Sequence, residues 1–474
     1  MSKTRRLNAR LFFVAVLAIL MVSSGPLLAE GAQAKNMRLL GLNDLQARSA
    51  YQPVIHQQGG RWIAYVGHHG GSALNRLTGV VESNGTSIVD VTDPRRPLYL
   101  HHIPGPSGVG EAGGAQMVRV CNGSELPNAN PENVYLLRAN GNIGHQVWDV
   151  TDPSDPELVV DVVQGLQGTH KNFWECDTGI AYLVSGIPGW RTNRATQIFD
   201  LSNPEAPIHI RDYGLVGQEP GSTGPVPTGL HGPISLGQRV YFGHGTSSNG
   251  IVQIVDRNKL LNGPPAPTPE NLQFPVIVQH KTSALGGAHT TFPVLGIPVP
   301  QLGEFSVGGT RDILVVVNES TANECIGEAH QMVFFMDITT EATPQVISNF
   351  HVPEASENFC SKGGRFGAHS SNENMTPIYN GRIVFIAYFN AGVRAVDIRN
   401  PFKPVEVAYF IPSVNGNTDP RCIEVNGVDR CKTAIQTNNV EVDNRGLIYI
   451  VDRANTGMHI LELTGSARTI ANFP

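Results

Sequence analysis

At 474 residues, the chain has room for two or three average domains or for one large repeat architecture. Charged residues make up only 16% of it, whereas 51 glycines and 33 prolines are typical of short strands joined by tight turns. The net charge of −6 and the lack of a basic stripe argue against nucleic acid as a partner. Composition therefore favours an all-β protein.

The N-terminus has the pattern of an export signal. Basic residues precede an apolar run from Leu11 to Val22, and small residues follow at Ala29 and Ala34. The run is shorter than a membrane-spanning helix, and Gly25 and Pro26 come soon after it. We expect residues 1–34 to be a signal peptide, cleaved near Ala29 or Ala34, and the mature chain to be periplasmic or secreted, with no membrane contact after cleavage.

One phrase recurs along the rest of the chain: apolar residues lead into an acidic residue, and a turn that often contains proline follows. Examples are SIVDVTDPRRP at Ser87, QVWDVTDPSDP at Gln146 and RAVDIRNPFKP at Arg394. The repeated acidic residues are Asp90, Asp149, Asp200, Asp256, Asp337, Asp397 and Glu462. They lie 51 to 81 residues apart, about the length of a propeller blade, and seven such units favour a closed ring.

A second, nearly continuous apolar strand precedes each phrase, for example GIAYLVSG at Gly179 and RIVFIAYFN at Arg382. Such runs are expected for strands that are buried on both faces. The segment NMRLLGLND at Asn36 reads like an outer strand without the rest of its blade. We therefore predict that residues 35–474 form a single seven-bladed β-propeller, closed by the N-terminal strand and carrying an insertion at about 257–310.

The repeated phrase resembles that of the LVIVD-repeat β-propeller proteins, and SIVDVTDPRRP and RAVDIRNPFKP are close matches. The resemblance covers most of the mature chain and implies the propeller fold. It implies little about function, because the repeated residues build turns and blade cores, and propellers host many unrelated activities.

The segment before each second strand carries one polar residue at a common position. These residues are Gln52, Gln116, His170, His231, His289, His369 and Asn438. The innermost strands of a propeller run along its axis, so equivalent positions form a ring around the channel. Four histidines from consecutive blades would therefore converge, with the three amides lining the other side of the channel.

A histidine ring of this kind has two interpretations. Four imidazoles with open positions suit copper or iron better than a closed structural zinc site, and we predict that His170, His231, His289 and His369 hold such a metal. Carboxylates at Glu175, Glu373 and Glu441 lie three to five residues beyond a ring position and are candidates for orienting the imidazoles. Alternatively, the ring only binds water in a wet channel.

Two propeller families with histidines on inner strands are similar in outline. Carotenoid-cleaving oxygenases hold Fe(II) with four histidines, and the selenium-binding-protein and methanethiol oxidase family is linked to copper. The full motif set of neither family is present here. The pair His68 and His69 follows a second strand rather than opening an inner one, so no ligand role is assigned to it.

All six cysteines lie in the part of the chain that we expect to be exported, where disulfides persist. Cys422 and Cys431 flank a predicted hairpin, and Cys121 and Cys176 hold equivalent points in successive repeats. Cys325 and Cys360 would complete three bridges, although six cysteines allow 15 pairings.

The remaining candidates are weaker. His145 and His244 lie at turns between strands and are expected to be surface or turn residues, or to line one mouth of the channel. Asn84, Asn122 and Asn318 fit the glycosylation sequon. The chain has no Gly-x-Ser-x-Gly elbow, phosphate loop or Cys-x-x-Cys motif, which disfavours a serine hydrolase, an NTPase and a dithiol redox enzyme.

The sequence thus supports a leading hypothesis and an alternative. The first is an exported copper- or iron-dependent oxidoreductase that acts on a small-molecule substrate in the channel. The second is a non-catalytic propeller that binds a protein or glycan through its blade faces and the 257–310 insertion. A metal-assisted hydrolase would need a carboxylate-rich ring, which the aligned positions lack.

Overall fold

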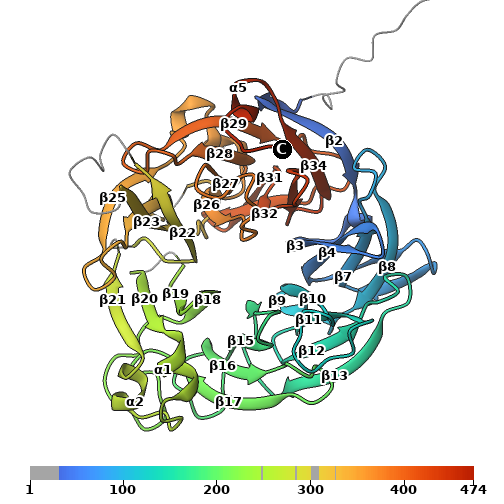
Figure 1. Cartoon of the computed structure of the whole chain (residues 1–474). Coiled ribbons are helices and arrows are strands. Elements are labelled where there is room, and N and C mark those ends of the chain that lie inside the picture. Colours follow the sequence, from blue (N-terminus) through green and yellow to red (C-terminus); the bar gives the residue numbers. More distant parts are fainter. Residues whose placement is uncertain (1–30, 247–248, 283–284, 300–308, 326) are drawn as a thin grey trace, which may run out of the picture.

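The computed structural model describes residues 31–246, 249–282, 285–299, 309–325 and 327–474. Its strands form antiparallel sheets arranged in a ring about a central axis, as expected for a β-propeller (Figure 1). The expected all-β fold is confirmed.

Most of the strands belong to four-strand groups that follow one another along the chain. The groups are β3 (Ala50–Gln58), β4 (Arg61–Gly70), β7 (Gly85–Asp90) and β8 (Leu98–Pro104); β10 (Val118–Asn122), β11 (Val134–Asn140), β12 (Gly144–Asp149) and β13 (Glu157–Gln164); β14 (Asn172–Trp174), β15 (Ile180–Ser185), β16 (Ala195–Asp200) and β17 (Ile208–Tyr213); β18 (Leu230–Leu236), β19 (Arg239–His244), β20 (Ile251–Asp256) and β21 (Val276–Lys281); β22 (Thr290–Pro298), β23 (Thr310–Val317), β24 (Val333–Asp337) and β25 (Gln345–Phe350); β26 (Phe366–Ser371), β27 (Ile383–Phe389), β28 (Val393–Asp397) and β29 (Val405–Ile411); and β32 (Thr437–Val442), β33 (Ile448–Asp452) and β34 (Met458–Leu463) with β2 (Met37–Asn43). The last two groups share one nine-stranded sheet because Phe389 of β27 pairs with Thr437 of β32.

The remaining elements are short. They are β1 (Gln33–Lys35), β5 (Ser72–Asn75), β6 (Val80–Ser83), β9 (Gly110–Ala115), β30 (Pro420–Val425), β31 (Val428–Thr433), the 3-10 turns Leu45–Ala47 and Glu354–Ser356, and the helices α1 (Arg257–Asn262), α2 (Pro269–Gln273), α4 (Phe359–Lys362) and α5 (Gly465–Arg468). Among the described residues, no helix is long and apolar enough to cross a bilayer.

The repeated acidic residues lie near the end of the third strand of each group, where the chain turns. The carboxylate of Asp90 accepts the backbone N–H of Thr92 at 2.8 Å, and Asp149 and Asp200 bond the residues two positions ahead in the same way. Asp256 instead caps helix α1. The repeated phrase is therefore a turn signal, because an acidic side chain can bond the backbone ahead of it.

The ring closes as the sequence predicts. Strand β2 pairs antiparallel with β34, so the N-terminal strand completes the last group (Figure 1). Apolar side chains also pack between the last group and the first. Tyr449 and Met458, on β33 and β34, share one cluster with Ala64 and Val89, on β4 and β7. Closure buries the edge that β34 would otherwise expose.

Strand β1 lies mostly within residues 1–34, which we expect to be a signal peptide. The first 30 of these residues fall outside the described part of the chain. Ala34 of β1 pairs with Phe410 of β29. A cleavage near Ala29 would therefore keep β1, whereas a cleavage after Ala34 would remove most of it.

The region 257–310 contributes to two groups instead of standing apart. Helices α1 and α2 lie between β20 and the outer strand β21, and β22 opens the next group. Residues 300–308 lie outside the described part of the chain.

Three disulfides join the cysteine pairs that the sequence suggests. Cys121 on β10 is bonded to Cys176, which follows β14, so this bridge links the inner strands of two neighbouring groups. Cys325 is bonded to Cys360, and Cys422 to Cys431 across the β30–β31 hairpin.

Candidate metal centre in the channel

The seven aligned polar residues all lie on an innermost strand or within two residues before one. Gln52, His231, His369 and Asn438 are on β3, β18, β26 and β32, whereas Gln116, His170 and His289 come one or two residues before β10, β14 and β22. None of the seven is more than 2% exposed. The channel at this depth is therefore lined by buried imidazoles and amides.

The structure brings the four ring histidines into a continuous row. His170 Nε2 lies 2.8 Å from His231 Nε2. The ring of His231 is stacked on that of His289 with centroids 3.3 Å apart, and the centroids of His289 and His369 are 4.4 Å apart. The Nε2 atoms of His170 and His231 are thus close enough to bind one ion, and the other rings follow in contact with them.

Backbone and hydroxyl groups orient these imidazoles. His231 Nδ1 lies 2.9 Å from the carbonyl oxygen of His289, and His369 Nδ1 lies 2.5 Å from that of Asn438. A carbonyl only accepts, so each Nδ1 carries the proton and each Nε2 keeps its lone pair. This is the tautomer in which Nε2 can bind a metal.

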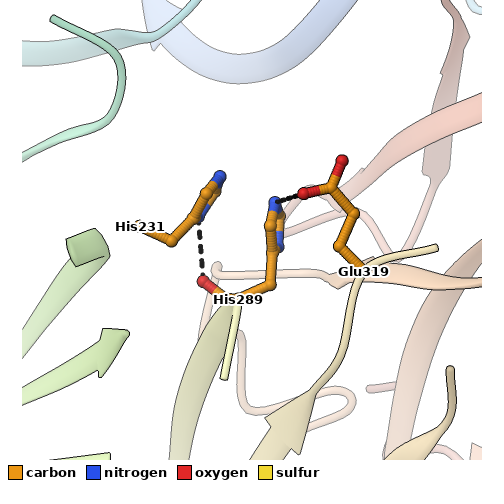
Figure 2. Close-up of side chains that lie close together, drawn as sticks. All are labelled: His231, His289 and Glu319. Carbon is orange, nitrogen blue, oxygen red and sulfur yellow. Dashed lines mark hydrogen bonds and ion pairs between the residues drawn. The ribbon is translucent and has the colours of Figure 1, made fainter. Parts of the chain in front are cut away.

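A carboxylate that the sequence analysis missed completes the cluster. Glu319 follows β23, and its side chain oxygens lie 3.7 Å from His289 Nε2 and 3.8 Å from His369 Nε2. Possible ligand atoms of His231, His289 and Glu319 all lie within 4.8 Å of one another, and Figure 2 shows the three side chains side by side. We call His170, His231, His289, His369 and Glu319 the histidine layer.

Burial determines the charge of this layer. It lowers the pKa of all four imidazoles well below the usual value, and nearby cations lower it further, Arg194 at His170 and Arg453 at His369. Burial also raises the pKa of Glu319, although Arg365 opposes this shift through an ion pair of 2.9 Å. The imidazoles are therefore neutral near pH 7, as metal ligands must be.

Several buried polar atoms in this part of the channel lack a hydrogen-bond partner. They include His289 Nε2, His170 Nδ1 and both polar atoms of the Gln116 amide. Buried polar atoms in folded proteins are nearly always paired, and an unpaired group costs about 1–3 kcal/mol. Within the described residues, these nitrogen and oxygen atoms therefore lack partners that a bound cation or water would supply.

Tyr51 and His69 also belong to this site, and the sequence analysis assigned neither to it. The Tyr51 hydroxyl lies 3.0 Å from His170 Nε2 and 3.4 Å from His231 Nε2. His69 packs edge-on against the Tyr51 ring with centroids 5.2 Å apart, and its Nε2 has no partner. Tyr51 immediately precedes Gln52 on β3, which was its only sequence signal.

The three glutamates proposed to orient imidazoles have other partners. Glu175 bonds Arg257, Thr178 and Ser235 away from the ring. Glu373 contacts both Lys171 and Arg119, and Glu441 accepts the backbone N–H of Asn374 at 3.0 Å. Backbone carbonyl oxygens, and not these carboxylates, orient the imidazoles of His231 and His369. We call Arg119, Lys171, Glu373 and Glu441 the ion-pair layer.

The weaker candidates are more buried than expected. His145 and His244 are at most 2% exposed, and His145 Nε2 lies 3.2 Å from the carbonyl oxygen of Val184. Among the sequon asparagines, Asn84 donates to the carbonyl of His69 and Asn318 to that of Gly287, and both are buried. These two amides are structural, since a buried side chain cannot carry a glycan.

The comparisons with known proteins found a likeness in structure, which we report here without further inference. No protein-family profile matches the chain, and no curated protein matches it. Among solved structures, the β-propeller domain of Cps50 (Swd1) from Myceliophteria thermophila aligns with a TM-score of 0.46 and 9% identity. The alignment covers 88% of this chain and all of that domain.

Proposed function

We propose that the histidine layer binds a redox-active transition metal, iron in preference to copper, and that the protein is an exported metal-dependent oxidoreductase acting on a small molecule. The observation that carries this proposal is the convergence of His231, His289 and Glu319 within 4.8 Å in a buried channel. Two imidazoles and one carboxylate with open positions form the ligand set typical of non-haem Fe(II), whereas softer ligands favour Cu(I).

The protein's own residues would prepare this site in three ways. Carbonyl contacts keep Nε2 of His231 and His369 available, and Arg365 favours the charged form of Glu319. The Tyr51 hydroxyl lies beside two imidazoles and can hold a proton there. A bound iron would supply one-electron chemistry and polarise a substrate oxygen.

Metal analysis tests the proposal. Protein purified from its native compartment without chelators should carry about one iron per chain, and the double variant His231→Ala/His289→Ala should carry less than a tenth of that. His209→Ala is a matched control, because the His209 side chain is 45% exposed and contacts Asp212 and Phe199, which are not members of the histidine layer. X-ray absorption should place nitrogen or oxygen ligands about 2.0–2.2 Å from the metal.

The outcomes are distinct. A metal that is retained by the double variant, or absent from folded wild-type protein after growth with iron and copper, would contradict the proposal. The second result would favour the alternative of a non-catalytic binding propeller. Circular dichroism of each variant separates loss of metal from loss of fold.

Export forms a separate part of the proposal. The leader pattern of residues 1–34 supports it, and three disulfides are compatible with an oxidising compartment. Because β1 pairs with β29, we expect cleavage near Ala29. N-terminal sequencing of the mature protein tests this, and a mature chain that begins at Lys35 or later would contradict it.

A further inference from the structure

A second polar site lies farther along the same inner strands. A cavity of about 270 Å³ is lined by residues of β3, β10, β14 and β32 and of the loop after β26. Its apolar wall consists of Val54, Ile55, Val120, Phe173 and Trp174. Its polar wall includes Arg119, Glu373 and Glu441, so three members of the ion-pair layer face the cavity.

Lys171 does not line the cavity, but together with Arg119 it places two cations against the single ionised carboxylate of Glu373. The two carboxylate oxygens of Glu373 are divided between Lys171 and Arg119, so one anion serves two cations. The side chains of Lys171 and Glu373 are only 2% and 1% exposed, whereas that of Arg119 is 13% exposed. Two cations around one anion leave an excess charge, and the more accessible cation is the arginine.

Arg119 has donor capacity left for a ligand. Its Nε donates to the carbonyl oxygen of Asn172 at 3.2 Å, and its Nη2 contacts Glu373. The guanidinium carbon lies 5.1 Å from the centre of the Phe173 ring, which fixes the plane of the group beside the apolar wall. Because a guanidinium has five N–H donors, those on Nη1, which bond no described residue, are available for an acceptor in the cavity.

Glu441 does not cancel the excess charge permanently. Its carboxyl group accepts the backbone N–H of Asn374 at 3.0 Å and of Val442 at 2.9 Å, and it makes no ion pair among the described residues. Burial and the charge of Glu373 raise its pKa to about 7, so it stays protonated to a much higher pH than an exposed glutamate does. His56, which also faces the cavity, is neutral because burial lowers its pKa.

We propose that this cavity binds a small organic carboxylate, with its anionic group on Arg119 and its hydrocarbon part against Phe173, Trp174 and the aliphatic wall. The site is distinct from the histidine layer, and binding there needs no metal. Protonated Glu441 is the form compatible with the ligand, since the charge of Glu373 is offset by Lys171 and Arg119, whereas a second ionised carboxylate in the same cavity would repel the ligand.

Calorimetric titration of metal-free protein with three probes of one shape tests the proposal. Phenylacetate should bind, 2-phenylacetamide should bind about ten- to hundred-fold more weakly because it lacks the charge, and 2-phenylethylamine should not bind. Arg119→Gln should weaken phenylacetate binding by a similar factor, and Arg119→Lys should retain part of it. Arg96→Gln is the matched control, because Arg96 is 88% exposed.

Glu441→Gln provides a second, independent readout. In wild-type protein, phenylacetate binding should weaken between pH 6 and pH 8 as Glu441 ionises. Glu441→Gln should bind at pH 8 as wild type does at pH 6. The proposal is overturned if the amine binds more tightly than phenylacetate, if Arg119→Gln folds and binds unchanged, or if none of the three probes binds.

Discussion

The histidine layer and the ion-pair layer occupy one channel and are built from the same inner strands, yet they accommodate buried polar groups in opposite ways. Lys171 and Glu373 follow ring histidines by one and four residues, and they meet across the channel as charged partners. The neighbouring imidazoles are neutral and, among the described residues, leave nitrogens such as His289 Nε2 without a hydrogen bond. The ion-pair layer thus pairs its buried charges with one another and has one cation in excess, whereas the histidine layer leaves buried nitrogens that only an added ligand would satisfy.

The largest expected effect tests this contrast through stability. Glu373→Gln removes the anion between Lys171 and Arg119, and leaving buried charge unpaired should destabilise the protein by about 3–5 kcal/mol. His289→Gln in metal-free protein removes no charge and should cost about 1 kcal/mol. Urea unfolding followed by tryptophan fluorescence measures the stability of both variants. Equal losses of stability would contradict the contrast between the two layers.

The next effect concerns the disulfide that joins β10 to the residues just after β14. Arg119 lies on β10, and Lys171 immediately precedes β14. Cys121→Ser/Cys176→Ser opens a disulfide with a sequence separation of 55 and should lower stability by about 2–4 kcal/mol. Cys422→Ser/Cys431→Ser opens a separation of only 9 and should have a smaller effect. Metal content should be unchanged in both variants, and loss of iron from the first would mean that the two layers depend on each other.

A smaller effect separates the two carboxylates within the ion-pair layer by their pH dependence. Burial raises the pKa of Glu441 to about 7, so the folded state holds this proton more tightly than the unfolded state does. Stability should therefore fall as pH rises from about 4.5 to 7, by about 1–3 kcal/mol. Glu373 has the opposite sign, because Lys171 and Arg119 hold its pKa at about 2 and its contribution is lost in acid.

Unfolding of Glu441→Gln at several pH values measures this effect. The variant should gain stability relative to wild type as pH rises from 5 to 8, and Glu373→Gln should show no such gain. A difference between Glu441→Gln and wild type that is independent of pH would contradict a protonated Glu441 in the folded state.

The smallest effect in free energy is specific to the histidine layer. Glu319→Gln keeps the shape of the side chain but removes its charge, and it should weaken iron binding at least ten-fold, or about 1.4 kcal/mol. Competition with a metallochromic chelator measures the affinity. Glu175→Gln is the control carboxylate, since Glu175 pairs with Arg257 away from the ring, and an equal loss there would argue against Glu319 as a ligand.

The sequence by itself determined the features that repeat. The acidic turns, the buried second strands and the inner position shared by His170, His231, His289 and His369 were all predictable, because each is a local pattern that every blade must satisfy. The ring closure by β2 was predictable for the same reason, since the N-terminal segment has the pattern of an outer strand whose partners lie at the other end of the chain.

Only the tertiary structure decided which side chains meet. Glu319 enters the site from the end of a second strand, so the alignment of inner strands could not include it. Glu373 follows a ring histidine as the sequence suggested, but it turns to Lys171 and Arg119, which are 202 and 254 residues away. Such contacts depend on how blades pack and which rotamers they leave open, and no local pattern encodes that choice.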